Sequence, residues 1–107
     1  MKTITTEQLR ERITRGDKFK LVMAFDGWRF TSAHIPGSLG VGSPAAAMSV
    51  LGKEEDIVVY CTSVDCTASQ ILYRALEEAG YVNVQRYPDG VAGWGDAGYE
   101  LEGDRVK

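Results

Sequence analysis

The chain has 107 residues, a length that fits one domain, since domains commonly span about 100–150 residues. Hydrophobic residues make up 44% of the chain and charged residues 25%, which is typical of a soluble globular protein. The formal net charge of -3 argues against nucleic acid and anionic membranes as partners, because both favour a basic protein face.

The first part of the chain predicts a helix, a strand and a loop. Thr5-Thr6-Glu7-Gln8 has the pattern of a capping box, and Gly16 is a natural end for the helix that follows. Residues 19–25 contain an apolar run that suits a buried strand. We expect residues 26–32 to form a loop in which Trp28 packs against the protein rather than binding a ligand.

The next segment predicts a short strand and a short helix. Leu39 and Val41 fit the strand. Ser43-Pro44 predicts the start of a helix over residues 45–50, because proline is favoured at the first helical position. The charged residues 53–56 are expected to form a solvated turn.

Cys61 lies where a predicted strand meets a predicted helix. Residues 57–60 are apolar and mostly β-branched, and apolar residues recur at helical spacing from Ala68 to Ala79, before Gly80. A cysteine below the amino end of a helix faces unpaired N–H groups and the positive end of the dipole. Both favour the thiolate, which is the nucleophilic form of cysteine.

The end of the chain completes an alternating pattern. Residues 82–87 predict another strand, and Asp89 is expected to cap a short helix over residues 91–97 that Gly98 closes. Strands that alternate with helices predict an α/β fold with a mainly parallel central sheet flanked by helices, in one domain over residues 1–107. Ligands bind such sheets beyond the carboxyl ends of the strands, where Cys61 lies.

Four stretches of the chain carry a recognisable pattern, in order. They are His34-Ile35-Pro36-Gly37-Ser38, the strand before Cys61, the helix ending near Tyr81, and the set Gly90, Trp94 and Gly98. Together they resemble the rhodanese-like domains, a family of single-cysteine sulfurtransferases, with Cys61 at the position of the family's nucleophile. Two departures stand out. Met23-Ala24-Phe25 replaces an Asp-x-Arg pattern, and the Cys-x4-Cys-x2-Ser spacing of Cys61, Cys66 and Ser69 suggests a subgroup.

The resemblance implies a sulfurtransferase in which Cys61 carries sulfur as a persulfide. A small sulfur donor would load the thiolate, and a thiol or protein acceptor would remove the sulfur, with no cofactor or metal. The implied substrate-binding loop is Thr62, Ser63, Val64, Asp65, Cys66 and Thr67. This loop has no Lys or Arg and carries Asp65, so we expect poor use of thiosulfate and better use of a persulfide donor.

Two other interpretations stay open. Cys61 and Cys66 would form a reversible disulfide in a thiol redox switch, or the domain would be a non-catalytic interaction module. Within the sulfurtransferase interpretation, Cys66 is either a resolving thiol or a buried residue that packs the helix start, and the second is slightly favoured. The chain offers one histidine and no second cysteine pair, which disfavours a zinc site. A Cys-x5-Arg phosphatase loop is disfavoured because the required position is Thr67.

Three further residues have expected structural roles. His34 is assigned to a turn rather than to a catalytic base, and Trp94 to packing. Ser69 either caps the first turn of the helix that follows the loop or supports the loop, and the cap is favoured. Neither a signal-peptide core nor an apolar run of membrane-spanning length is present. We therefore expect a cytoplasmic protein that is a monomer or a weak homodimer.

Overall fold

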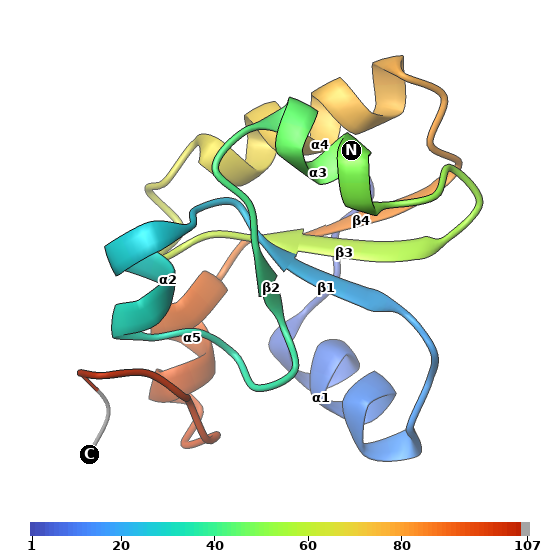
Figure 1. Cartoon of the computed structure of the whole chain (residues 1–107). Helices are drawn as coiled ribbons and strands as arrows, with labels where there is room; N and C mark the ends of the chain where they lie inside the picture. Colours follow the sequence, from blue (N-terminus) through green and yellow to red (C-terminus); the bar gives the residue numbers. More distant parts are fainter. Residues whose placement is uncertain (106–107) are drawn as a thin grey trace.

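A four-stranded, wholly parallel sheet forms the centre of the computed structural model, which describes residues 1–105. The strands lie in the order β2-β1-β3-β4, with all carboxyl ends at one edge (Figure 1). Their bounds are β1 Lys20–Met23, β2 Leu39–Gly40, β3 Asp56–Tyr60 and β4 Asn83–Tyr87. The predicted α/β fold with a mainly parallel sheet is confirmed.

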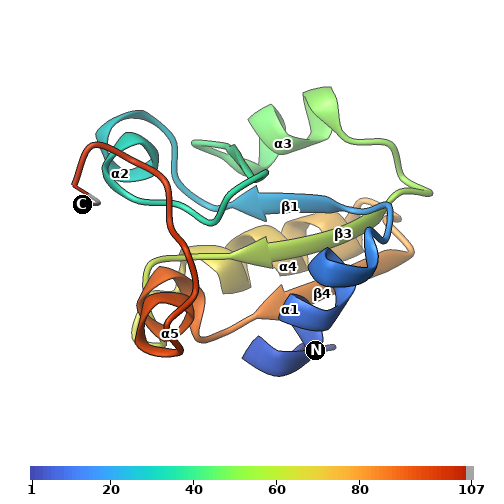
Figure 2. The same ribbon diagram turned by 90° about the horizontal axis from the view of Figure 1, so that it is seen from below.

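Five helices flank the sheet. They are α1 Thr6–Arg15, α2 Gly27–Ser32, α3 Pro44–Val50, α4 Ala68–Glu78 and α5 Gly90–Asp96. Helices α3 and α4 cover one face, and α1 and α5 cover the other (Figures 1 and 2). The carboxyl edge of the sheet therefore lies between helices on both sides, which is where Cys61 was predicted.

The two faces of β3 contribute to two separate cores. Ile57 and Val59 pack with α4, whereas Val58 and Tyr60 pack with α1 and α5. All four side chains are fully buried. A strand covered on both faces has no polar positions, which explains the continuous apolar run before Cys61.

Helix α1 has the predicted capping box. Thr5 accepts a hydrogen bond from the Gln8 backbone N–H at 3.1 Å, and the Thr5 N–H donates to the Gln8 side chain at 2.9 Å. Gly16 ends the helix with φ of 74°, a conformation that glycine adopts without strain. Both ends of this helix follow the sequence prediction.

The segment expected as a loop over residues 26–32 contains helix α2, so that prediction was wrong. None of the residues of α2 is buried, so the segment has no apolar period to indicate a helix. Two side-chain hydrogen bonds hold α2 together from within. The Thr31 hydroxyl donates to the Gly27 carbonyl at 2.8 Å, and the Ser32 hydroxyl donates to the Trp28 carbonyl at 2.6 Å.

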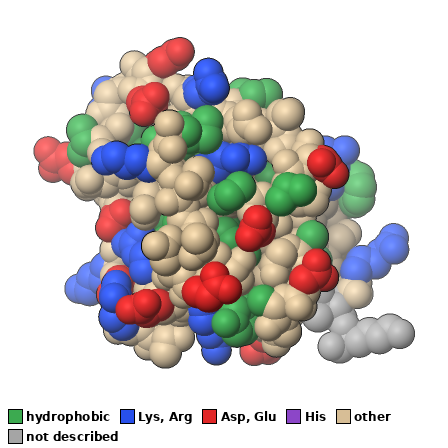
Figure 3. All heavy atoms as spheres, turned by 180° about the vertical axis from the view of Figure 1, so that it is seen from behind, with side chains coloured by type: hydrophobic (Ala, Val, Ile, Leu, Met, Phe, Trp, Pro, Cys, Tyr) green, Lys and Arg blue, Asp and Glu red, His purple; other side chains and the backbone are tan. Residues whose placement is uncertain are grey.

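The surface mixes charges of both signs. Acidic and basic side chains are interspersed over the face opposite to that of Figure 1 (Figure 3). None of the helices formed by residues 1–105 is long and apolar enough to cross a membrane.

Candidate active site

The backbone of Cys61 is held by the start of α5. Val91 donates its N–H to the carbonyl of Cys61 at 3.0 Å, and Ala92 donates to the carbonyl of Thr62 at 2.9 Å. Gly90 makes this approach possible, since its φ is 62° and an added Cβ would overlap the Cys61 carbonyl oxygen. The side chain of Cys61 is only 1% exposed. The predicted nucleophile thus lies at a fixed point at the end of β3.

Cys61 and Cys66 are joined by a disulfide, with their Cα atoms 6.3 Å apart. The loop reaches this geometry by turning back on itself, because the Cys66 N–H donates to the Ser63 carbonyl at 3.2 Å. Cys66 is half-buried. The expectation that Cys66 only packs the helix start was therefore wrong, because its sulfur is bonded to that of Cys61.

The loop offers backbone N–H groups to an anion. Among residues 62–67, Cys66 is the one whose backbone N–H donates to a protein acceptor within the described chain. At the N-terminus of α4, Thr67 is the N-cap residue but makes no side-chain cap bond. The remaining N–H groups of the loop, together with the positive end of α4, favour negative charge beside Cys61.

Ser69 does not cap α4, contrary to the sequence prediction. Its hydroxyl accepts a hydrogen bond at 2.9 Å from Nε of Arg86, on β4. Both residues are buried, with Ser69 1% and Arg86 7% exposed, and no carboxylate of residues 1–105 forms an ion pair with Arg86. Arg86 pairs with Val59 across the sheet, two residues before Cys61. A buried positive charge thus lies under the first turn of α4, and the sequence analysis missed it.

A cleft of about 490 Å³ opens beside the loop. The residues that line it include Thr62 and Cys66 from the loop, together with Phe25, Trp28 and Arg29. Trp28 is 72% exposed, so the expectation that it packs was wrong. The Arg29 guanidinium carbon lies 4.4 Å from the Phe25 ring centre and 5.2 Å from that of Trp28.

Arg29 changes the electrostatics expected for the site. The loop itself has no positive side chain and exposes Asp65, as the sequence indicates. The cleft wall nevertheless carries the guanidinium of Arg29, held by its stacking on two aromatic rings. The sequence prediction considered the loop alone, and Arg29 adds a positive charge that it omitted; poor use of thiosulfate stays a prediction.

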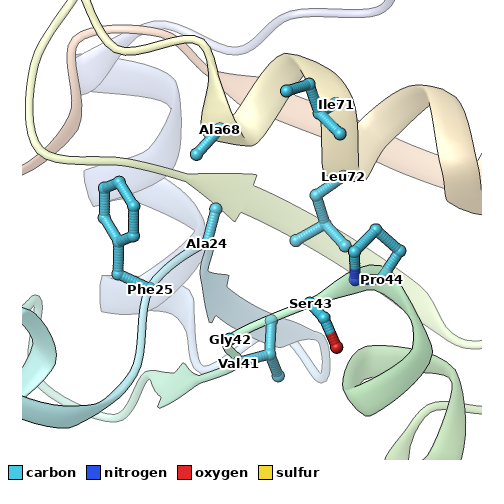
Figure 4. Close-up of a pocket in the computed structure, with 9 residues that line it drawn as sticks. All are labelled: Ala24, Phe25, Val41, Gly42, Ser43, Pro44, Ala68, Ile71 and Leu72. Carbon is cyan, nitrogen blue, oxygen red and sulfur yellow. The ribbon is translucent and has the colours of Figure 1, made fainter.

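A second hollow, of about 210 Å³, shares Phe25 with the cleft as a lining residue (Figure 4). It is mostly apolar and is bounded by Ala24, Val41, Pro44, Ala68 and Leu72, among others. None of the loop residues 62–67 lines it. We therefore assign the candidate site to the cleft that contains Cys66 and not to this hollow.

The His34–Ser38 segment anchors the strand that carries Cys61. The hydroxyl of Tyr60 accepts a hydrogen bond from the Ile35 N–H at 3.0 Å and lies 2.7 Å from the Ser38 hydroxyl. Burial raises the pKa of Tyr60 to about 12, because a phenolate there would lose its water. His34 stacks on Phe30 and contacts the Phe30 carbonyl through Nδ1 at 2.8 Å. His34 also forms an isolated bridge with Glu102, and the turn follows at Pro36 and Gly37, so its contacts are structural but it is not itself in the predicted turn.

Two residues near α5 complete the comparison with the sequence. Trp94 is 1% exposed and donates from Nε1 to the Glu100 carbonyl at 2.9 Å, which confirms packing. Asp89 precedes α5 but makes no side-chain cap bond, contrary to prediction. Its carboxylate instead accepts a hydrogen bond from the Thr6 hydroxyl at 3.2 Å.

In the described part of the chain, no group of three or more His, Cys, Asp or Glu side chains is placed to hold a metal ion.

The sequence of residues 5–97 matches the family model of the rhodanese-like domain. The chain therefore belongs to the rhodanese-like domain family. The comparison with curated protein sequences found no match.

Solved structures share the fold. The rhodanese-like domain of an Anabaena protein is 26% identical, with a TM-score of 0.83, and the match covers 98% of this chain and 81% of that one. A Bacillus halodurans protein is 20% identical, with a TM-score of 0.87, over 98% and 79% of the two chains. Thiosulfate sulfurtransferase from Pseudomonas aeruginosa is 20% identical, with a TM-score of 0.83, over 97% of this chain and 20% of that one. At such identities the last two similarities establish the fold only.

Proposed function

We propose that the protein is a sulfurtransferase that carries a sulfane sulfur on Cys61. The observation that supports this most strongly is the position of Cys61, buried at the end of β3 within a loop whose N–H groups are largely free. The loop from Thr62 to Thr67 would bind the donor through its backbone N–H groups and not through the Cys66 side chain, and Arg29 also lines the cleft.

The reaction has two half-steps. The Cys61 thiolate attacks the outer sulfur of a donor such as thiosulfate or a persulfide, and sulfite or a thiolate leaves. Cys61 then carries the sulfur as an anionic persulfide, which a thiol or protein acceptor removes. Loop N–H groups stabilise the persulfide anion, by roughly 3 kcal/mol for each well-aimed donor if oxyanion holes are a guide. The proposed chemistry needs no cofactor.

The test is intact mass spectrometry of the reduced, desalted protein. After exposure to thiosulfate, and separately to a small persulfide, the protein should gain one sulfur atom on the peptide that contains Cys61. The Cys61→Ser variant should gain none and keep its fold by circular dichroism. Free thiols without any gain of sulfur from either donor would exclude the proposal.

A thiol–disulfide redox switch is the second candidate, and the Cys61–Cys66 disulfide is the observation that favours it. In this function the disulfide alone changes the state of the protein, and no sulfur is carried. A reduced protein that forms the disulfide under mild oxidant, yet takes no sulfur from either donor, would support the switch over the transferase.

A further inference from the structure

We propose that Cys66 resolves the Cys61 persulfide, so that the protein releases hydrosulfide and is left with the Cys61–Cys66 disulfide. The acceptor of the sulfur is then not a second substrate. An external dithiol, either a small molecule or a reducing protein, restores the two thiols. This inference rests on the proposed persulfide at Cys61; it replaces the external acceptor of the second half-step with Cys66, and it names hydrosulfide as the product and a dithiol as the partner.

The first argument is geometric. Two cysteines can be bridged without backbone movement only if their Cα atoms lie within about 7 Å. The separation of Cys61 and Cys66 is 6.3 Å, and the two sulfurs are bonded. The turn closed by the Cys66 N–H and the Ser63 carbonyl holds the loop in this shape. The structure thus has the geometry of the product of the proposed step.

The second argument is chemical balance. The thiolate of Cys66 attacks the Sγ atom of Cys61 and forms the Cys61–Cys66 bond. The bond between Cys61 Sγ and the outer sulfur breaks, and the outer sulfur leaves with the bonding pair, taking up one proton to form hydrosulfide. In this step the Cys66 thiolate is oxidised and the outer sulfur of the persulfide is reduced; over loading and resolution together, two thiols are oxidised and one sulfane sulfur is reduced, so no added oxidant is needed.

The third argument concerns access to the disulfide. Cys61 is 1% exposed, whereas Cys66 is half-buried and lines the cleft of about 490 Å³. A reducing thiol therefore reaches the Cys66 sulfur first. The thiolate that leaves is then Cys61, which lies near the N-terminus of α4, where negative charge is favoured. The exposed ring of Trp28, on the wall of the same cleft, offers a contact to a reducing protein.

The experiment is a single turnover without added thiol. Reduced, desalted wild type, Cys66→Ala and Cys66→Ser are each mixed with excess thiosulfate under nitrogen. Hydrosulfide is measured colorimetrically, and the protein is measured by intact mass. Wild type that has been oxidised to the disulfide beforehand is the control, and it should neither take up sulfur nor release hydrosulfide.

The proposal predicts one equivalent of hydrosulfide from wild type, and a protein two hydrogen atoms lighter than its reduced form. Both Cys66 variants should instead retain one added sulfur and release none until a thiol is supplied. Wild type that keeps the added sulfur, or Cys66 variants that release hydrosulfide as wild type does, would overturn this inference and leave the proposed transferase intact. Failure of the reduced wild type and both Cys66 variants to take up sulfur here, together with failure of both donors in the loading test of the proposed function, would overturn both.

Discussion

Arg86 donates from Nε to the hydroxyl of Ser69, 2.9 Å away, and so joins β4 to the first turn of α4. The residues are 17 positions apart, and both are buried. Because the Cys61 loop runs between β3 and α4, this bond fixes the helix on which the loop ends. It also retains a guanidinium charge near the site without a carboxylate to neutralise it, among the residues the structure describes.

Ser69→Ala should therefore destabilise the protein by about 1–3 kcal/mol, because it leaves a buried charged donor without its partner. In an Arg86→Met background the same substitution should cost less than about 1 kcal/mol, since no donor remains to be orphaned. Urea unfolding of the four proteins of this cycle, wild type and the three variants, gives the coupling. Thr67→Ala is the matched control, because Thr67 is exposed and makes no cap bond. Equal costs of Ser69→Ala in both backgrounds would show that the bond has no energetic role.

Gly90→Ala should lower both stability and the rate of sulfur loading. The added methyl group would overlap the carbonyl of Cys61, and the φ of 62° disfavours any side chain, so we expect a loss of about 2–4 kcal/mol. Gly98 is the control that separates steric overlap from backbone strain. Its φ is 85°, so a side chain there is strained, but no atom lies within 4 Å of an added Cβ. Gly98→Ala should cost only about 1 kcal/mol and should not change loading. Similar effects of the two variants on loading would contradict the role of Gly90 in positioning Cys61.

Arg29 should attract an anionic donor to the cleft, whereas Asp65 should repel it. Arg29→Ala should raise the apparent KM for thiosulfate about two- to fivefold, and Asp65→Asn should lower it by a similar factor at low salt. The same measurements at high salt are the control, because screening should reduce both effects. If Asp65→Asn lowers KM while Arg29→Ala leaves it unchanged, the guanidinium does not face the bound donor.

Because Tyr60 is buried with a raised pKa, the protein should lose stability at alkaline pH. A tyrosine whose pKa is raised by burial stabilises the fold below its unfolded pKa of about 10. That contribution disappears as the pH rises from 10 toward the folded value of about 12. The unfolding free energy should fall by about 2–3 kcal/mol over this interval on account of Tyr60. Burial also raises the pKa of Tyr87, which adds to the fall.

The check is urea unfolding at about pH 8 and about pH 11, for wild type and Tyr60→Phe. The variant should be less stable near neutrality, because it loses the hydroxyl that binds Ile35 and Ser38, but its stability should depend less on pH. An equal alkaline loss in both proteins would mean that Tyr60 does not cause it.

The position of Cys61 was predictable from the sequence because it depends on local patterns. The apolar run before it and the helical period after it each lie within a dozen residues, and they specify a strand, a loop and a helix. Trp94 was likewise assigned to the core, since a large aromatic residue in a small domain is usually buried.

Arg86, Ser69 and Arg29 could not be assigned in the same way. The bond between Arg86 and Ser69 depends on the register of β4 against β3 and on how α4 lies over both strands. Arg29 reaches the cleft because residues 27–32 form a helix. That helix buries no residue, so the sequence shows no helical spacing of apolar residues that would predict it. Ser69 looked like a cap because serine near a helix start commonly is one, but a buried guanidinium competes for its hydroxyl.

The central claim is that the sulfur moves by way of Cys61, and a pulse-chase experiment tests it most directly. Reduced Cys66→Ala protein is loaded with thiosulfate that carries a heavy isotope in its outer sulfur, separated from the donor and then mixed with cyanide. We predict that the labelled sulfur leaves the Cys61 peptide and appears as thiocyanate in equal amount, and that the Cys61→Ser/Cys66→Ala double variant delivers none. Labelled thiocyanate from the double variant, or a loaded protein that delivers no sulfur once the donor is removed, would contradict the claim.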